Sequence, residues 1–120
     1  MYIRELDDCA EITAGDNTLL REIINPLIDP LSLRYSLAHA RVAPGATTLP
    51  HRLNNSEVYY ILEGEGEMTI DGEKGALKPG STVYIPPESM QFVKNTGPGE
   101  LVFICIVDPA WRKEDELVGQ

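Results

Sequence analysis

Short apolar runs, separated at close intervals by glycine, proline and asparagine, are the dominant pattern along the chain. Runs of this kind between turn signals are typical of β-strands. The separators are interpreted as turns, because glycine supplies positive φ and proline fixes φ. Many short strands at near-regular spacing predict an all-β sandwich or barrel. The expected strands are residues 19–24, 33–42, 58–62, 68–70, 83–85, 91–93 and 101–107.

The dipeptide Asp71-Gly72 predicts a tight hairpin turn, since two-residue turns between strands favour Asp-Gly. Helical periodicity is weak everywhere except in the charged segment 111–117. A length of 120 residues fits one domain with an apolar core that needs no disulfide or metal to support it. We expect a core barrel over about 32–108, N-terminal strands within 1–31 and a short tail over 109–120.

The run 101–107 is apolar at every position, so neither face of this strand is expected to meet water. One face would line the interior of the barrel, and the other needs a cover. A second subunit is the simplest cover, so we expect a homodimer. The alternative is that the N-terminal strands of the same chain cover this face.

The charge balance limits the classes of partner. The formal net charge is −9, whereas affinity for nucleic acid and for anionic membranes is supplied by clustered Lys and Arg. We therefore expect no nucleic-acid or membrane partner. The charged N-terminus lacks a signal-like apolar stretch, and no apolar run is long enough to span a bilayer. A cytoplasmic protein is expected, in which Cys9 and Cys105 are reduced thiols; a disulfide between them is the alternative.

Two spaced sets of residues carry a family resemblance. The first set is Gly45, His51, Leu53, Glu57 and Gly64. The second set follows the expected hairpin and is Gly80, Pro86, Glu88, Gln91 and Asn95. In order and spacing, the two sets resemble the two motifs of the cupin family. This resemblance implies a small single-domain cupin, a jelly-roll β-barrel (double-stranded β-helix) of the kind often described as mannose-6-phosphate isomerase-like.

The resemblance also implies a candidate metal site, with departures. Metal-binding cupins hold a divalent ion with two histidines and a glutamate of the first motif and a histidine of the second. Here His51 and Glu57 occupy two of these positions, while Leu53 and Gln91 replace the other two. The chain contains two histidines in total, so one subunit cannot supply three. His51, Glu57 and Gln91 with waters would form a weak, oxygen-rich site for Mn, Fe, Zn or Ni.

The second histidine, His39, lies in the expected strand 33–42. If its face looks into the barrel, His39, His51 and Glu57 would form a two-histidine, one-carboxylate set. The alternative is a strand histidine outside the site. Further residues that could reach the interior are the polar side chains of Tyr35, Arg41 and Tyr59 and the apolar side chains of Met90, Phe92 and Phe103.

Three functions follow from these residues. In the first, the barrel binds a small polar metabolite, such as a sugar or hydroxy acid, beside the ion, in an isomerase- or epimerase-type or other metal-dependent enzyme. Glu57 or Tyr59 would then move the proton. In the second, the barrel is a non-catalytic, metal-free ligand-binding protein or sensor. In the third, His51 and Glu57 perform acid–base catalysis without metal, since burial raises the pKa of a carboxyl group.

Overall fold

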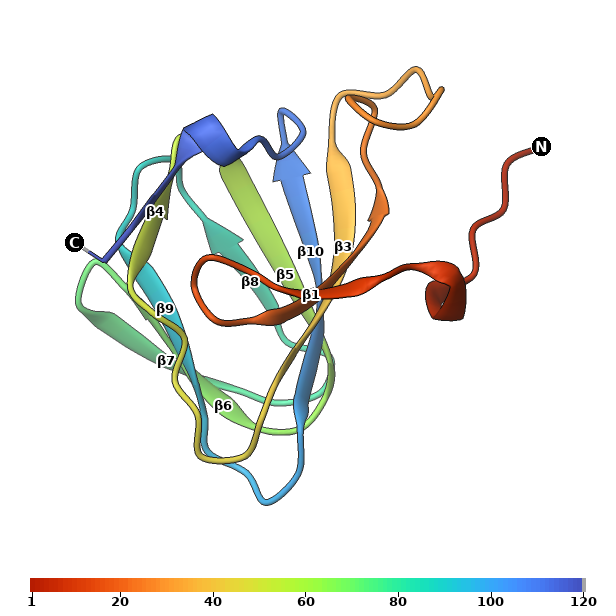
Figure 1. Cartoon of the computed structure of the whole chain (residues 1–120). Coiled ribbons are helices and arrows are strands. Elements are labelled where there is room, and N and C mark those ends of the chain that lie inside the picture. Colours follow the sequence, from red (N-terminus) through yellow and green to blue (C-terminus); the bar gives the residue numbers. More distant parts are fainter. Residues whose placement is uncertain (120) are drawn as a thin grey trace.

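Two antiparallel sheets face each other in the structure, a computed structural model that describes residues 1–119 (Figure 1). In spatial order, sheet A contains β1 (Glu11–Thr13), β2 (Leu19–Ile24), β3 (Ser36–Val42), β10 (Leu101–Asp108), β5 (Ser56–Glu63) and β8 (Thr82–Ile85). Sheet B contains β11 (Glu116–Val118), β4 (His51–Leu53), β9 (Gln91–Asn95), β6 (Gly66–Ile70) and β7 (Glu73–Leu77). Two short 3-10 turns, η1 (Leu6–Asp8) and η2 (Lys113–Asp115), complete the elements. The expected all-β barrel is confirmed.

Each expected strand is present, with differences at the ends. The run 33–42 forms β3 only from Ser36, because the Arg34 carbonyl accepts a hydrogen bond from the Ala110 N–H (2.7 Å) instead of joining the sheet. The expected hairpin joins β6 to β7, and Asp71 (φ 47°) and Gly72 (φ 85°) both take the left-handed conformation that a type I′ turn requires.

Two short strands, β4 and β11, were not expected from the sequence, because a three-residue strand is too short to show alternation. The equally short β1 lies within the segment 1–31, where N-terminal strands were expected. The prediction of helical structure over 111–117 is wrong, except for the single 3-10 turn η2. Glu116–Val118 forms β11 instead, because it pairs its backbone with β4. The chain therefore returns to the barrel at its C-terminus.

The apolar core fills one end of the space between the sheets. Its members come from strands of both sheets and include Ala40, Val42, Ile61, Met68, Leu77, Val93, Leu101 and Phe103. Ile61, Leu101 and Phe103 are at most 1% exposed. We call this part of the barrel the closed end.

The two faces of β10 differ in burial. Phe103 and Cys105 face inward and are buried, whereas Ile106 is 36% exposed on the outer face of sheet A. The expectation that neither face meets water is therefore wrong for the isolated chain. The N-terminal strands do not cover the outer face, because β1 and β2 extend the edge of sheet A beside β3.

Cys9 and Cys105 are both free and buried, so the structure contains no disulfide between them. Within residues 1–119, none of the helical segments has the length and apolar character needed to cross a membrane.

Candidate functional site

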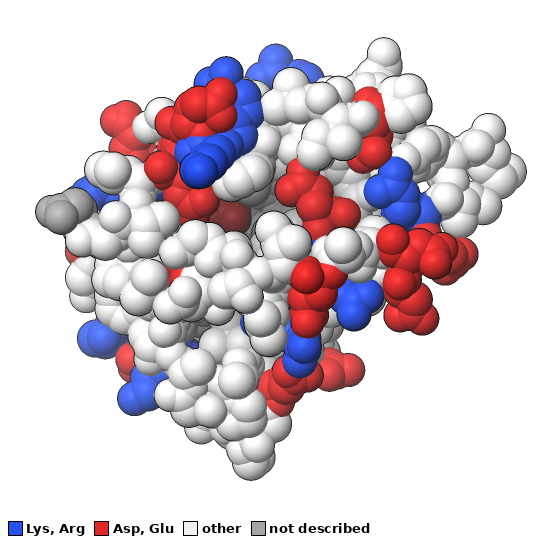
Figure 2. Space-filling view, viewed as in Figure 1, with Lys and Arg blue, Asp and Glu red and all other residues white. Residues whose placement is uncertain are grey.

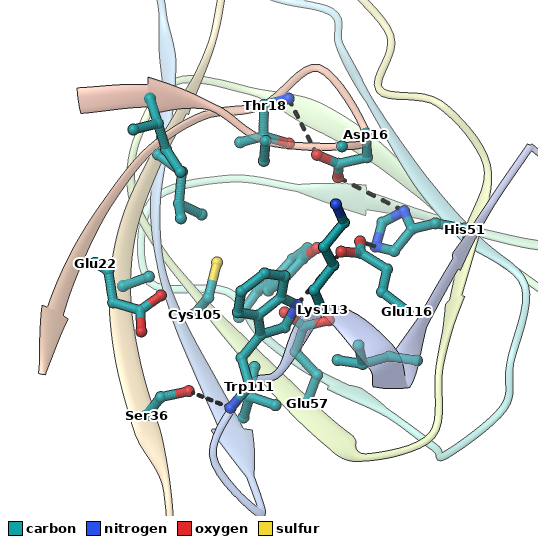
Figure 3. A pocket seen from close by; sticks show the side chains of 18 of the residues that line it. Asp16, Thr18, Glu22, Ser36, His51, Glu57, Cys105, Trp111, Lys113 and Glu116 are labelled. Carbon is teal, nitrogen blue, oxygen red and sulfur yellow. Dashed lines mark hydrogen bonds and ion pairs between the residues drawn. The ribbon is translucent and has the colours of Figure 1, made fainter. Parts of the chain in front are cut away.

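A cavity of about 470 Å³ opens at the other end of the barrel, which we call the open end. A volume of this size is typical of small-molecule sites. Its floor and walls are the inward side chains of β3, β5 and β10, and its rim is formed by the β1–β2 hairpin, β4 and the C-terminal segment (Figure 3). On the face seen in Figure 2, acidic side chains border the hollow. The polar and charged lining residues are Thr13, Asp16, Thr18, Glu22, Ser36, His51, Glu57, Tyr59, Cys105, Lys113 and Glu116.

Glu57 lies on β5, where the inward alternation of the strand places its carboxyl group in the cavity wall. It is only 8% exposed. Its Oε1 accepts a hydrogen bond from the Gln91 Nε2 amide (3.1 Å), while Oε2 has no hydrogen-bond partner among residues 1–119. Burial raises the pKa of Glu57 to about 8, and the nearby Asp16 and Glu116 charges add to the rise. Glu57 is therefore a neutral carboxylic acid at pH 7.

A chain of two hydrogen bonds fixes the orientation of Glu57. The Tyr59 hydroxyl donates to Gln91 Oε1 (3.1 Å), so the Gln91 amide must present its nitrogen to Glu57. The Tyr59 ring packs against Phe103 with 4.5 Å between ring centroids. Burial raises the pKa of Tyr59 well above its usual range. Because the Tyr59 proton is directed at Gln91, the side chain positions Glu57 through Gln91.

His51 lies on β4, opposite Gln91 of β9, and is 4% exposed. Its Nδ1 is 3.1 Å from the Leu49 carbonyl oxygen. A carbonyl oxygen can only accept, so Nδ1 carries a proton, and Nε2 is the nitrogen that can gain or lose one. Nε2 is 4.0 Å from Glu116 Oε2, and Nδ1 is 3.6 Å from Asp16 Oδ2. The imidazole is thus held between two carboxylates.

Glu116 and Asp16 reach the site from opposite ends of the chain. Glu116 begins β11, and its Oε1 accepts a hydrogen bond from Trp111 Nε1 (3.3 Å). Burial raises the pKa of Glu116, and the neighbouring His51 partly offsets this. Asp16 lies in the β1–β2 turn, where its Oδ1 accepts from the Thr18 backbone N–H (3.1 Å). Sequence reasoning missed both residues, because neither belongs to a motif and only tertiary folding brings them to His51.

The three residues predicted as metal ligands lie close together but do not form a free donor set. The Gln91 amide oxygen accepts from Tyr59, and its nitrogen faces Glu57. Across residues 1–119, no three His, Cys, Asp or Glu side chains are arranged to hold an ion. In this arrangement the Gln91 amide is engaged by Tyr59 and Glu57 and is not free to bind the predicted ion together with His51. The metal hypothesis stays a prediction.

The second histidine lies outside the site. His39 pairs with Arg21 of β2 and Ile104 of β10 on the outer face of sheet A, because the small residues Ala38 and Ala40 take the inward positions of β3. The two-histidine set is therefore not assembled.

Among the other residues expected in the interior, Tyr59 and Phe103 line the cavity. Arg41 instead forms ion pairs with Glu11 and Glu100 outside the barrel. Tyr35 is exposed, and neither Met90 nor Phe92 reaches the cavity, because the inward positions of β9 belong to Gln91, Val93 and Asn95.

Known proteins support this fold over nearly the whole chain. An uncharacterized protein of Methanocaldococcus jannaschii is 38% identical over 112 residues, which cover 92% of this chain and 89% of that protein. The L-ectoine synthase of Aliivibrio fischeri is 24% identical over 110 residues, covering 91% of this chain and 86% of the synthase. The solved structure of Pac13, a nucleoside dehydratase of Streptomyces, superimposes with a TM-score of 0.80 at 16% identity, covering 100% of this chain and 92% of Pac13.

The model of the Cupin domain family matches residues 38–107, which is more than half of the chain. The match spans the strands that build the closed end and the inward residues Glu57, Tyr59 and Gln91. The jelly-roll barrel implied by the two sequence motifs is therefore confirmed, and the chain belongs to the cupin family.

Proposed function

We propose that the chain is an enzyme that moves protons on a small polar molecule bound at the open end of the barrel. The observation that carries this proposal is Glu57: a carboxylic acid held neutral by burial, with one oxygen left without a partner at the cavity. This oxygen is open to the cavity and can therefore contact a bound molecule. A neutral carboxylic acid is suited to give a proton to a substrate oxygen.

His51 supplies the complementary function. With Nδ1 fixed by the Leu49 carbonyl, Nε2 is the nitrogen that accepts a proton from the substrate. Glu116 and Asp16 then stabilise the imidazolium that forms. In one turnover, Glu57 gives a proton to a substrate oxygen and His51 removes one from the same molecule. A proton then passes back from His51 to Glu57. Isomerisation, dehydration and cyclisation with loss of water all need this pair.

The named relatives support a reaction of this class. Pac13 is named a nucleoside dehydratase, and removal of water needs an acid for the departing hydroxyl and a base for a second proton. A synthase is also found among the relatives that cover most of this chain. A divalent ion would polarise a substrate oxygen, but no step here is routed through one, because Gln91 is held by Tyr59 and Glu57.

The proposal is tested by incubating the purified protein with a metabolite extract in D₂O and following the mixture by mass spectrometry. We expect one or a few metabolites to gain deuterium or lose water, and Glu57→Gln to lower this rate at least about 100-fold. The matched control is Glu63→Gln, at the exposed end of the same strand. Repeating the assay after chelator treatment, and again after adding Mn, Fe, Zn or Ni, shows whether the reaction depends on a metal ion. Metabolites that bind but never change would instead support the non-catalytic ligand-binding barrel.

We also propose a homodimer formed through the outer face of sheet A. Leu37, Ile106, Val58 and Tyr84 are register partners and form one apolar row across four strands. Ile106 is 36% and Tyr84 60% exposed, and an exposed apolar row of this kind marks an interaction surface. Analytical ultracentrifugation should give a dimer at micromolar concentration and a monomer for Ile106→Glu. A monomeric wild-type protein contradicts this proposal.

A further inference from the structure

Trp111, the single tryptophan of the chain, forms hydrogen bonds through both its backbone and its side chain. Its backbone N–H donates to Ser36 Oγ (2.9 Å), and its carbonyl oxygen accepts from Asn25 Nδ2 (3.0 Å). Ser36 and Asn25 are both buried, so they give the Trp111 backbone a fixed attachment to the barrel. The indole Nε1–H donates to Glu116 Oε1 (3.3 Å). The indole therefore has a defined place in the cavity wall (Figure 3).

The side chain of Glu116 depends on this indole for its position. Within residues 1–119, Trp111 Nε1 is the one hydrogen-bond donor to the Glu116 carboxyl group. While Oε1 accepts from the indole, Oε2 lies 4.0 Å from His51 Nε2. Strand pairing does not set this orientation, because β11 pairs only its backbone with β4 and leaves the side-chain torsions of Glu116 unfixed.

The chemical nature of the donor matters as much as its place. An indole N–H is neutral and can only donate. It can hold the Glu116 carboxylate without neutralising it, whereas an arginine would, as Arg112 does for Asp115 in the same segment (2.9 Å). The charge of Glu116 therefore remains available to His51. A nearby carboxylate stabilises the imidazolium that forms when a histidine takes up a proton.

We propose that Trp111 is a positioning residue, which holds Glu116 so that its second carboxylate oxygen faces Nε2 of His51. Asn25 and Ser36 complete the arrangement, since they tie the Trp111 backbone to the end of β2 and the start of β3 in sheet A. Glu116 and His51 belong to β11 and β4 of sheet B. The inference rests on the proposed function, in which His51 accepts a proton, and adds a residue that acts on His51 through Glu116.

The first measurement needs no substrate. Trp111 gives the single indole N–H signal in a proton–nitrogen correlation spectrum, and exchange of this proton with water reports on its hydrogen bond. We expect Glu116→Ala to speed the exchange at least about fivefold. Glu114→Ala is the matched control, because it removes an exposed carboxyl group from the same segment, and it should leave the exchange unchanged. Equal exchange in Glu116→Ala and wild type overturns the inference.

The second measurement is a double-mutant cycle in kcat, with the metabolite that reacts in the D₂O assay as substrate. Trp111→Phe keeps an aromatic wall but loses the N–H, and it should lower kcat about three- to tenfold. Glu116→Gln should lower kcat about tenfold. Adding Trp111→Phe to Glu116→Gln should lower kcat no further, because the indole acts through that carboxylate. Losses that multiply in the double variant overturn the positioning role, since a residue that only lines the wall acts independently of Glu116.

The outcomes separate the inference from the proposed function. Turnover with multiplied losses, or indole exchange that does not respond to Glu116→Ala, overturns the role of Trp111 and leaves the proton-moving enzyme in place. A protein that turns over no metabolite contradicts the proposed function and the inference together. If circular dichroism shows that Trp111→Phe is unfolded, Ser36→Ala takes its place in the cycle, because it releases the Trp111 backbone and keeps the indole.

Discussion

The closed and open ends of the barrel are built from the same strands, yet their inward side chains differ in kind. On β5 the inward residues run from Ile61 at the closed end to Tyr59 and Glu57 at the open end. On β3 they run from Val42 to Ser36. The closed end is filled with apolar groups, whereas the open end keeps a cavity with an acid in its wall. Strand alternation alone sets which residues point inward, and position along the strand decides whether they serve stability or function.

The largest expected effect is the pH dependence that Glu57 confers on stability. Its pKa is about 8 in the folded chain against 4.5 ordinarily. Unfolding therefore releases a proton between these values, and the stability present below about pH 4.5 is lost as pH rises to about 8. Glu57→Gln should remove this loss, making the variant more stable than wild type by about 4 kcal/mol at pH 8 and little different at pH 4. Urea unfolding at several pH values measures this difference in the free energy of unfolding.

The control for that series is Glu63→Gln, at the exposed end of β5. The free energy of unfolding of this variant should change with pH in the same way as that of the wild type. A wild-type protein whose free energy of unfolding does not fall between pH 5 and pH 8 would show that Glu57 is not a buried neutral acid.

A matched pair of valines compares packing at the two ends. Val93 is 2% exposed in the closed core, and Val107 is 5% exposed in the cavity wall. Val93→Ala creates a new void and should cost about 2 kcal/mol, whereas Val107→Ala only enlarges an existing cavity and should cost about 1 kcal/mol. Denaturant unfolding gives both losses of stability from the shifts in midpoint, provided that the variants and the wild type have equal m-values. Equal costs would mean that the open end is packed as tightly as the closed one.

The last comparison concerns the tyrosine that orients Glu57 through Gln91. Tyr59→Phe leaves the Gln91 amide oxygen without its donor and should cost about 1–2 kcal/mol of stability. Tyr60→Phe is the matched control on the exposed face of the same strand and should cost almost nothing. In the D₂O assay, Tyr59→Phe should slow turnover less than Glu57→Gln, because it disturbs the position of the acid without removing it. A loss equal to that of Glu57→Gln would make Tyr59 itself the proton donor.

The sequence predicts the closed end better than the open end, for a physical reason. Alternation and turn residues such as Asp71-Gly72 act locally, so the strands of the barrel could be identified from the chain alone. His51 and Glu57 could be identified as cavity residues because their motif positions lie on consecutive strands, β4 and β5, which face each other from opposite sheets. Asp16, Trp111 and Glu116 could not, since short polar segments from both chain ends reach the cavity only through pairing with the barrel.

The protonation state of Glu57 can be measured directly. Carbon-13 NMR of the glutamate carboxyl groups, with the Glu57 resonance assigned by its loss in Glu57→Gln, follows this group alone through a pH titration. We expect a midpoint at about 8, so that Glu57 is a neutral acid at pH 7. A midpoint near 4.5, the ordinary value for this side chain, would contradict it, because the open end would then hold an ionised carboxylate with no proton to give.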